Sequence, residues 1–592
     1  MEKKEIIKSG EFLVKEVDAK DIFIPEEFND EQRMIAQTCQ DFIDTEAYPN
    51  MKQLETGDRE LMRTVLKKAG DLGLMGISIP EEYGGFGQSF VTQMLVAETT
   101  GAGYSVSVAY MANVGIGTLP IMYYGNEDQR QRYVTKLASG EYLGAYCLTE
   151  PGAGSDANSG KTNAKPTEDG KYYILNGQKM WITNAGFADT FVVFAKIEND
   201  RVLSAFIVES KWPGVVVGAD EHKMGIKGSS TCQIFFNDVK VPAENLLGKR
   251  GEGFRIALNI LHMGRIKLGG DTIGAAKKAI NDSVKYANER KQFGVQIAAF
   301  GAIKYKLAQQ VIRLLAAESA VYRVSNDVDI VMAKLKEEMD DKGRAAIEAI
   351  AHYAVEAALL KVYGSEMLDY VADEAVQIHG GMGYSAEMDV ERGYRDSRIN
   401  RIFEGTNEIN RILVVDTAMK RALKGDFDLF PQAEKLFEGI DSITDGKVAG
   451  EDYFAQKKRY IKNIKKVILL LMHSVSKHFA KNLVNEQEIL NNIAEIMMEV
   501  YASESLALRA EKLQSMGRDI KIFKDALDVN MFDTAEVARK MAYEAVYSFA
   551  DADQAAKLIK AVDTLTKVEG VNVKDARRRI ADKLIEDNEY KF

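Results

Sequence analysis

Residues 146–156 read Tyr-Cys-Leu-Thr-Glu-Pro-Gly-Ala-Gly-Ser-Asp, and they mark the point where the pattern of the chain changes. A proline and two glycines prevent regular structure there and let backbone amides approach a ligand. Thr149, Ser155 and Asp156 add hydrogen-bonding side chains at short range. Taken alone, such a loop is more often an ordinary turn into a strand. As a binding element it would suit the polar edge of a flat cofactor or a phosphate.

The pattern on either side of this loop predicts two kinds of domain. Residues 28–142 carry apolar side chains at three- and four-residue spacing, which predicts a helical domain. Residues 143–252 contain short β-forming runs and predict a middle β domain of ordinary size. Two of the runs flank Asn176-Gly177, which predicts a hairpin on a tight turn. The runs are 172–175, 178–183, 191–195, 203–208, 214–217 and 232–236.

The helical period returns over residues 253–423 and predicts a helical bundle domain. A polar, acidic segment at 424–454 is expected to be a linker, and 455–592 a further helical domain. Residues 1–27 form an N-terminal extension whose mixed charges do not predict a secretory signal. The predicted fold class is mainly α with a central β domain.

Composition narrows the classes of function. The chain has 592 residues, of which 46% are hydrophobic and 28% charged, as in ordinary proteins with several globular domains. A net charge of −11 argues against general nucleic-acid binding. Three widely separated cysteines and six histidines without HxH or HExxH spacing predict neither disulfides nor a metal site. The densest apolar run, 467–472, is too short to span a membrane, so the expected location is cytoplasmic.

Residues 395–409 read Arg-Asp-Ser-Arg-Ile-Asn-Arg-Ile-Phe-Glu-Gly-Thr-Asn-Glu-Ile. Arg395, Arg398 and Arg401 recur at every third residue, which predicts that they share one flank of a helix. Glu404 follows two apolar residues and precedes turn and cap formers. Desolvation there would raise its pKa and make it a better base. From this segment alone, a surface carboxylate at a helix end is the simpler interpretation.

Two further segments have the chemistry of a binding site. In Lys179-Met-Trp-Ile-Thr-Asn184, strand alternation puts Trp181 and Thr183 on one face. They could stack on and hydrogen-bond an aromatic cofactor, although a packed core pair is the commoner meaning. The spacing Gly381-x-Gly383-x-x-Ala386 formally matches a dinucleotide fingerprint. That interpretation is rejected, because the preceding residues 354–376 are helical and no βαβ unit surrounds them.

Together these segments resemble the acyl-CoA dehydrogenase family over residues 28–423. Six motifs in order, at plausible spacing, are a strong signal where one would be weak. The resemblance implies an N-terminal helical domain, a middle β-barrel-like domain and a C-terminal four-helix bundle, with FAD between them. The motifs are 146–156, 179–184, Met224-Gly-Ile-Lys-Gly-Ser229, Glu289-Arg-Lys-Gln-Phe-Gly294, Gln377-Ile-His-Gly-Gly381 and Ile402-Phe-Glu-Gly-Thr406.

The resemblance also implies a reaction, the α,β-dehydrogenation of an acyl-CoA thioester to the trans-2-enoyl-CoA. Glu404 would remove the α-proton while the β-hydrogen leaves as hydride to the flavin N5. The backbone N–H of Glu404 and a ribityl hydroxyl would polarise the thioester carbonyl, and a dry site would keep the carboxylate basic. Some members keep this glutamate at a position that aligns with Gly264, which cannot serve here.

The remaining site residues come from the same resemblance. Leu148, Thr149, Trp181 and Thr183 would line the flavin ring, and Thr406 and Glu408 would meet the phosphate or adenosine part. Four residues would reach the FAD of a neighbouring subunit, which implies at least a dimer. They are Arg290, Phe293, Gln377 and Gly381. Tyr146, Ser155 and Ile182 complete the expected FAD set. The expected substrate residues are Ser155, Arg265, Phe403 and Gly405, with Arg265 on the CoA portion.

The expected length of the acyl chain and the residues after 423 both indicate one subgroup of this family. Medium-chain members form the pocket floor with bulky polar groups that align with Val108 and Ala112, so the smaller side chains here predict long acyl chains. Simple packing between helices explains them equally well. The chain also continues for about 170 residues beyond the usual end. In this it resembles the very-long-chain subgroup, whose extra helical domain implies a dimer.

Within this part, residues 457–484 contain eight Lys or Arg and no acidic residue, with one apolar helical face. This pattern fits an interfacial membrane helix or, as favoured here, a core helix. The resemblance implies an electron transfer flavoprotein as acceptor. An acyl-CoA oxidase and a non-catalytic scaffold or assembly protein of the same fold remain alternatives.

Overall fold

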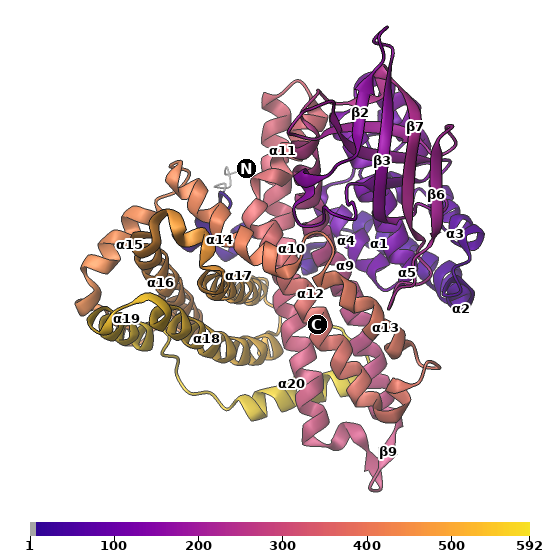
Figure 1. Ribbon diagram of the computed structural model, residues 1–592. Coiled ribbons are helices and arrows are strands. Elements are labelled where there is room, and N and C mark those ends of the chain that lie inside the picture. Colours follow the sequence, from indigo (N-terminus) through magenta and orange to yellow (C-terminus); the bar gives the residue numbers. More distant parts are fainter. Residues whose placement is uncertain (1–6) are drawn as a thin grey trace.

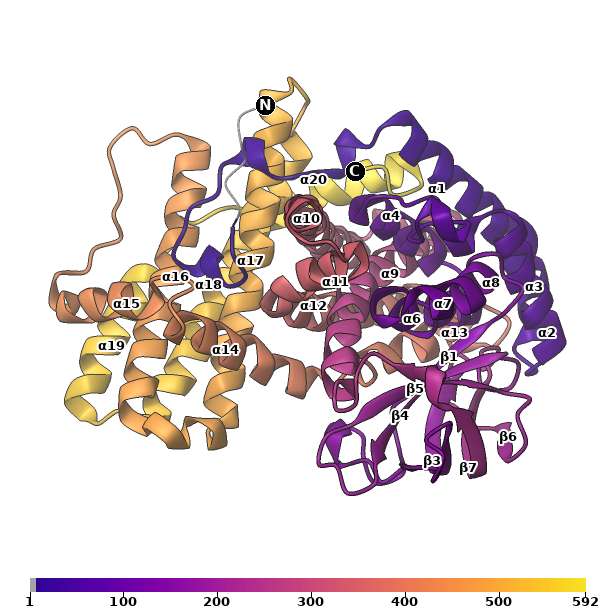
Figure 2. The same cartoon turned by 90° about the horizontal axis from the view of Figure 1, so that it is seen from above.

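The helical bundle at the centre of the molecule separates the β domain from the extra C-terminal helices, as two perpendicular views show (Figure 1 and Figure 2). This computed structural model describes residues 7–592. The start of the expected N-terminal extension, residues 1–6, lies outside the described residues. The predicted fold class, mainly α with a central β domain, is confirmed.

The N-terminal helical domain begins with a capped helix. Asn29 Oδ1 accepts a hydrogen bond from the N–H of Gln32 (2.8 Å), and Gln32 Oε1 accepts one from the N–H of Asn29 (3.0 Å), so two amides at this helix end are paired. Helix α4 is buried on nearly all sides and packs against the bundle. The helices are α1 (Asp30–Phe42), α2 (Met51–Leu54), α3 (Arg59–Asp71), α4 (Phe90–Gly101), α5 (Ser105–Met111), α6 (Leu119–Tyr124), α7 (Glu127–Gln129) and α8 (Thr135–Ala138).

One helical run in this domain, Ser105–Tyr124, is long and apolar enough to cross a membrane by length and composition, with a mean hydropathy of 1.3. In the described part of the chain 83% of this run is buried inside the protein. The core helix of a soluble protein passes the same test, so the run is weak evidence for a membrane span.

The β domain is built on an eight-stranded sheet within the described residues, in the order β6-β7-β3-β2-β4-β5-β8, with β1 parallel to β4. Its inner face is filled by apolar side chains such as Phe191, Val193 and Phe206, all fully buried. The strands are β1 (Gly144–Cys147), β2 (Asn163–Pro166), β3 (Tyr172–Thr183), β4 (Thr190–Ile197), β5 (Ser204–Glu209), β6 (Val215–Asp220), β7 (Thr231–Pro242) and β8 (Leu246–Leu247).

The hairpin predicted at Asn176-Gly177 is wrong. Strand β3 runs straight through these residues and pairs with β7, with a bulge between Leu175 and Gly177. A Cβ at Gly177 would lie 2.5 Å from Thr162 Oγ1, so glycine is present because β2 approaches closely. The tight turn instead joins β2 to β3 at residues 167–171, where Gly170 has φ 67°.

The bundle domain supplies the long helices on which the other domains pack. A short hairpin of β9 (Lys291–Gln292) and β10 (Val295–Gln296) projects at its far end (Figure 1). Its helices are α9 (Gly253–Glu289), α10 (Gly301–Glu338), α11 (Lys342–His352), α12 (Ala354–His379), α13 (Asp389–Ser397) and α14 (Asn407–Leu423).

The prediction that Arg395, Arg398 and Arg401 share one helix flank is also wrong. Helix α13 ends at Ser397, and residues 398–401 form a tighter 3-10 turn. As a result the side chains separate. Arg395 pairs with Glu391 (2.5 Å), whereas Arg401 reaches Asp369 on α12 (3.4 Å).

The C-terminal part forms a third helical domain and then returns to the bundle through α20, which packs on α10 (Figure 2). The segment expected as a linker contains a helix, α15, whose Leu429 and Ala433 are fully buried. The burial of these apolar side chains stabilises a helix, although the acidic composition of the segment predicted a linker. The helices are α15 (Leu429–Glu438), α16 (Tyr453–Phe479), α17 (Gln487–Ser515), α18 (Lys521–Phe549), α19 (Ala552–Leu565) and α20 (Val573–Asp587).

The basic stretch considered as a membrane helix is α16, and it lies inside this domain. Its apolar face is buried, including Ile464, Ile468 and Leu471. Most of its basic side chains pair with acids from other segments. The ion pairs are Lys457–Asp528 (2.7 Å), Lys458–Glu511 (2.7 Å), Arg459–Glu451 (2.5 Å), Lys462–Glu16 (2.6 Å) and Lys465–Glu504.

The N-terminal extension contacts the extra C-terminal domain and shares an ion-pair cluster with it and the bundle domain. Phe12 is buried with its ring edge against Tyr501 of α17 (centroids 4.9 Å apart). Arg509 of α17, 1% exposed, pairs with Glu26 of the extension (2.7 Å) and Glu318 of α10 (2.5 Å). The extension, the bundle and the extra domain therefore share one buried charge cluster.

Candidate active site

Glu404 lies in a left-handed turn between the 3-10 turn 398–401 and α14. Its φ is 58°, and that of Gly405 is 83°. Glycine adopts such a φ freely, but glutamate does so with strain, which surrounding contacts must hold. Thr406 then caps α14, because its Oγ1 accepts a hydrogen bond from the N–H of Ile409 (3.3 Å).

Two buried side chains hold this turn. Arg265 of α9, 3% exposed, donates from Nε to the carbonyl of Glu404 (3.0 Å). Asn410 donates from Nδ2 to the carbonyl of Gly405 (2.8 Å). A Cβ at Gly405 would lie 3.1 Å from Asn410 Nδ2, so the close approach also favours glycine. Gly405 was expected to contact the substrate. The structure shows that it also shapes this turn.

The expected contact between Arg265 and CoA needs correction. The guanidinium is buried behind Glu404, where it holds the backbone of the base. A side chain engaged there has no free surface for a nucleotide. Arg265 is therefore a positioning residue in this structure, and the sequence held no signal for it because the two residues are 139 positions apart.

The carboxylate of Glu404 faces a cavity of about 90 Å³ and has no partner for Oε2 among residues 7–592. Burial raises its pKa to about 7, although the nearby charges of Arg265 and Lys361 act in the opposite direction. Lys361 is itself buried and donates to Asn407 Oδ1 (2.7 Å). A buried, unpartnered carboxylate of this kind can take up a proton near neutral pH.

Gly264 lies directly against this carboxylate. A Cβ at Gly264 would stand 2.9 Å from Glu404 Oε2 and 3.2 Å from its Cδ. Positions 264 and 404, which the resemblance gives as the two alternative positions of the base, are therefore in direct contact. A side chain at residue 264 and the present position of Glu404 exclude each other.

The end of β3 reaches the same cavity. Thr183 lines it together with Phe403 and Glu404. Ile182 is 2% exposed and points into the β core, so it can offer a ligand only its backbone. Trp181, with φ 60° and 52% exposure, lies outside that core. The alternation predicted for Trp181 and Thr183 therefore holds, and neither is a packed core residue.

The loop after β1 is pinned to β3 by a buried ion pair that sequence reasoning missed. Lys179 donates to Glu150 Oε1 (2.7 Å) and to the carbonyl of Leu148 (3.1 Å). The carbonyl of Thr149 accepts from the N–H of Met180 (2.9 Å). These contacts set Thr149 beside Trp181. Simple alternation would put Lys179 on the same face as Trp181. The bulge between Lys179 and Ile182, with Trp181 at φ 60°, turns Lys179 inward, and no signal in the sequence indicated it.

The other residues expected at FAD from this loop differ in exposure. Tyr146 is mostly buried, with its ring against Phe194 (centroids 4.9 Å apart), and Leu148 is buried too. Ser155 is exposed on the loop surface. Only part of this stretch therefore presents side chains to a ligand.

Four expected residues lie far from Glu404, at the other end of the bundle (Figure 1). Arg290 and Phe293 belong to the β9–β10 hairpin, and Gln377 and Gly381 to the end of α12 and the turn after it. All four are exposed, Phe293 at 94%. Within one chain they are not brought to the base. Thr406 and exposed Glu408 lie beside it, at the start of α14.

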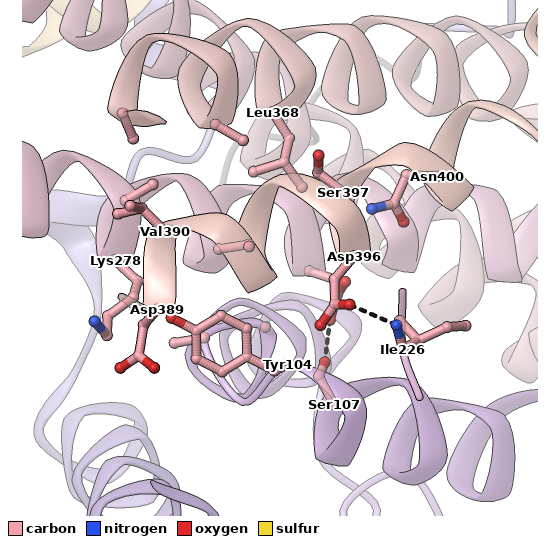
Figure 3. A pocket seen from close by; sticks show the side chains of 18 of the residues that line it. Tyr104, Ser107, Ile226, Lys278, Leu368, Asp389, Val390, Asp396, Ser397 and Asn400 are labelled. Carbon is pink, nitrogen blue, oxygen red and sulfur yellow. Dashed lines mark hydrogen bonds between the residues drawn. The ribbon is translucent and has the colours of Figure 1, made fainter. Parts of the chain in front are cut away.

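A second cavity of about 60 Å³ adjoins the one at Glu404, and Val108, Asp271 and Asn400 line both. Figure 3 shows Asn400, Tyr104 and Asp396 around it, with Asp396 accepting a hydrogen bond from the N–H of Ile226. Ala112 lines the first cavity beside Val108. The small side chains that the sequence singled out therefore border the carboxylate's cavity.

The side chains around these cavities fit a flat aromatic cofactor. The hydroxyls of Thr149 and Thr183 and the indole N–H of Trp181 have no hydrogen-bond partner among residues 7–592. The described residues contain no group of three or more His, Cys, Asp or Glu placed to hold a metal ion. The three cysteines are free and buried.

Comparison with known families gives matches along most of the chain. Residues 29–141 match the family described as acyl-CoA dehydrogenase, N-terminal domain, residues 145–239 the middle domain, and residues 251–419 the C-terminal domain. Residues 463–563 match a further family, also described as acyl-CoA dehydrogenase, C-terminal domain. The last match covers part of the extra helical domain.

Individual proteins are similar over the whole length. A probable acyl-CoA dehydrogenase of Bacillus subtilis is 43% identical over 99% of both chains. The crystal structure of an acyl-CoA dehydrogenase complexed with FAD from Bacillus anthracis has a TM-score of 0.96 at 44% identity and covers 99% of this chain and 100% of that one. The very long-chain specific acyl-CoA dehydrogenase of Rattus norvegicus is 36% identical over 76% of this chain and 70% of its own.

Proposed function

This chain belongs to the acyl-CoA dehydrogenase family, and we propose that it oxidises long-chain fatty acyl-CoA to the trans-2-enoyl-CoA in fatty acid β-oxidation. The enzyme is an oxidoreductase with FAD as cofactor. FAD supplies the acceptor for the hydrogen that leaves the β-carbon. The chain's own residues bind the substrate, polarise it and remove the α-proton.

Glu404 is the proposed base, through Oε2. The observation that carries this assignment is a buried carboxylate oxygen without a partner in the described chain, in a cavity it shares with Thr183. Burial makes the carboxylate more basic, and an oxygen without a hydrogen bond is free to take a proton. Arg265 holds Glu404 in place by donating a hydrogen bond to the backbone carbonyl of Glu404.

The backbone N–H of Glu404 is the proposed donor to the thioester carbonyl. It makes no backbone hydrogen bond within residues 7–592, and the left-handed turn takes it out of any helix ladder. A fixed donor at the oxygen where negative charge develops lowers the barrier to α-proton removal. Arg265 and Asn410 therefore support both the base and this donor.

Thr149, Trp181 and Thr183 are the proposed contacts to the flavin ring, and Thr406 and Glu408 to the phosphate or adenosine part. The unpartnered hydroxyls and the exposed indole support this assignment. For the FAD of a neighbouring subunit we propose Arg290, Phe293, Gln377 and Gly381. Their exposure, with Tyr384 88% exposed beside them, supports a homodimer through this end of the bundle.

The decisive experiment is anaerobic reduction of the bound flavin by acyl-CoA. Glu404→Gln should retain FAD and bind substrate but leave the flavin oxidised. Asp416→Asn is the matched control, since it removes a carboxylate from the exposed Asp416–Lys420 pair on α14 (2.7 Å). Normal bleaching by Glu404→Gln would refute the base. Stoichiometric peroxide during aerobic turnover would instead favour an oxidase.

The preference for long chains rests on the small groups at Val108 and Ala112 and on the cavity beyond them. Similarity to a very long-chain specific enzyme supports it. Turnover should rise toward long acyl-CoAs, and Ala112→Leu should shift the optimum to shorter chains. Activity that collapses beyond medium length in the wild type would contradict the proposal.

An electron transfer flavoprotein is the proposed acceptor, in the cytoplasm. Exposed Trp181, next to the expected flavin, supports an accessible cofactor edge. Membrane binding is not favoured, because α16 buries its apolar face and pairs its bases. Liposome sedimentation of the whole protein tests this, and chromatography with light scattering tests the dimer.

A further inference from the structure

Lys267 carries a buried ammonium group from which no described residue accepts a hydrogen bond. It is 4% exposed and makes neither a hydrogen bond nor an ion pair within residues 7–592. Burial alone lowers its pKa to about 8. Buried lysines are ordinarily paired, and the others of the bundle and β domain follow that rule, as with Lys179 and Lys361. An unpaired one requires another partner.

The position of Lys267 is close to the reaction centre. It lies on α9 three residues after Gly264, about 4.5 Å further along the helix axis. Its side chain lines the cavity that holds Glu404 and also a smaller cavity next to it, of about 20 Å³. Met111 lines both as well. Lys267 therefore stands where the two spaces meet, at the end away from the base.

The smaller cavity contains a second polar atom without a partner. Gln93 lines it from α4. The Nε2 of Gln93 donates to the carbonyl of Gln88 (3.0 Å), which fixes the amide orientation. Its Oε1 is buried and has no donor in the described chain. Lys267, whose ammonium has no acceptor, and Gln93, whose amide oxygen has no donor, thus line the same small space.

One chemical group satisfies both atoms. A hydroxyl accepts a hydrogen bond from an ammonium and donates one to an amide oxygen. A space of about 20 Å³ suits a group with a single oxygen. A carboxylate would satisfy Lys267 but would face the lone pairs of Gln93. Most of the remaining lining is apolar, as an acyl chain requires, including Val96, Met111 and Val114. Ser78 and Tyr110 also line the cavity, and the Tyr110 hydroxyl is already engaged with the carbonyl of Leu74 (2.7 Å).

Resting on the proposed function, we propose that this enzyme accepts acyl-CoAs with a hydroxyl at the far end of the chain, which Lys267 and Gln93 bind together. The acyl chain runs from Glu404 past Met111, and its terminal oxygen takes the place of solvent between the two polar side chains. Among hydroxylated substrates the site thereby selects chain length, because only one length brings the hydroxyl to Lys267. Plain long chains extend instead along Val108 and Ala112 into the other adjoining cavity.

The first test uses the wild-type holoenzyme and anaerobic flavin reduction. Hexanoyl-, octanoyl-, decanoyl- and dodecanoyl-CoA are each compared with their ω-hydroxy and ω-carboxy counterparts. At one chain length the hydroxylated substrate should exceed the plain one by about tenfold in kcat/KM. Equal or lower values at every length would overturn the inference, and so would a preference for the carboxylates alone. If no acyl-CoA reduces the flavin, the proposed function itself fails.

The second test assigns the preference to its residues. Lys267→Met removes the ammonium and keeps an unbranched side chain of nearly the same length. It should abolish the preference, measured as the ratio of kcat/KM for the hydroxylated and plain substrates, so that a change in the rate common to both cancels. Gln93→Met, which removes the acceptor, should reduce the preference. Lys466→Met on α16 is the control and should leave the preference unchanged. A hydroxyl preference that survives Lys267→Met, in protein with normal FAD content, would overturn the assignment.

Discussion

Replacing Gly264 by alanine adds one methyl group against the carboxylate of Glu404, the proposed base. The Cβ would stand 2.9 Å from Glu404 Oε2 and 3.2 Å from Cδ, whereas ordinary contact begins at about 3.4 Å. Arg265 and Asn410 hold the backbone of Glu404 by its carbonyl and that of the next residue. The side chain must therefore give way, by about 0.5 Å.

The expected loss of rate follows from this displacement. A misplacement of about 1 Å at a reacting group costs roughly a hundredfold, so half that shift should cost about tenfold in the rate of flavin reduction. Folding should not suffer, because alanine in a helix interior is more favourable than glycine by roughly 0.5–1 kcal/mol. The variant should therefore be slow but as stable as the wild type.

Stopped-flow flavin reduction under anaerobic conditions measures the effect, with thermal unfolding and FAD content in parallel. Gly301→Ala is the control, since its Cβ would meet only Arg578 Nη2 at 3.4 Å. It should keep the full rate. A wild-type rate in Gly264→Ala would refute the placement of the carboxylate against α9. A loss of FAD or of stability would show that the methyl group acts elsewhere.

Four further outcomes are expected. The rate of flavin reduction at low substrate should fall as the pH drops through about 7, because Glu404 must be ionised to accept a proton. Its folded pKa lies above the ordinary 4.5, so its stabilising contribution is complete below pH 4.5 and is lost as pH rises through about 7. Glu404→Gln should remove that part of the pH dependence of the melting temperature, and an unchanged profile would contradict the assignment. Arg509→Met should lower the free energy of unfolding by about 1.5–3 kcal/mol in urea titrations, since Glu318 loses one of its two cationic partners and keeps only Lys277. A loss below about 1 kcal/mol would show that Lys277 alone is enough for Glu318. Lys179→Met should release FAD more readily in fluorescence titrations, because Glu150 and its loop lose their anchor to β3, while wild-type retention would contradict this.

Local patterns predicted the domain order and the position of Glu404. The period of apolar residues distinguishes helix from strand over long segments, and Trp181 alternates with Ile182 as a strand requires. The same local reasoning failed at Asn176-Gly177, because pairing with β7 outweighs a turn signal. It failed again at α15, where buried Leu429 outweighs an acidic surface.

Contacts between distant segments lie beyond such patterns. No pattern in the sequence near Arg265 indicates that it binds the carbonyl of Glu404. The sequence predicted a contact between Arg265 and CoA instead. Lys267 has the spacing of an ordinary helix residue, and only the fold brings Gln93 of α4 into the same cavity. A hydrogen bond across many residues depends on how helices pack, and the packing depends on the whole core.

By itself the sequence determined the fold class, the family and the residue proposed as the base, because motif spacing and hydrophobic period are local properties of the chain. Only the tertiary structure decided that Gly264 makes room for that base, that Arg265 and Asn410 hold its strained turn, and that Lys267 remains unpaired beside it. Burial and desolvation, which set the pKa of Glu404, come from what surrounds a residue in space and not from its neighbours in the chain.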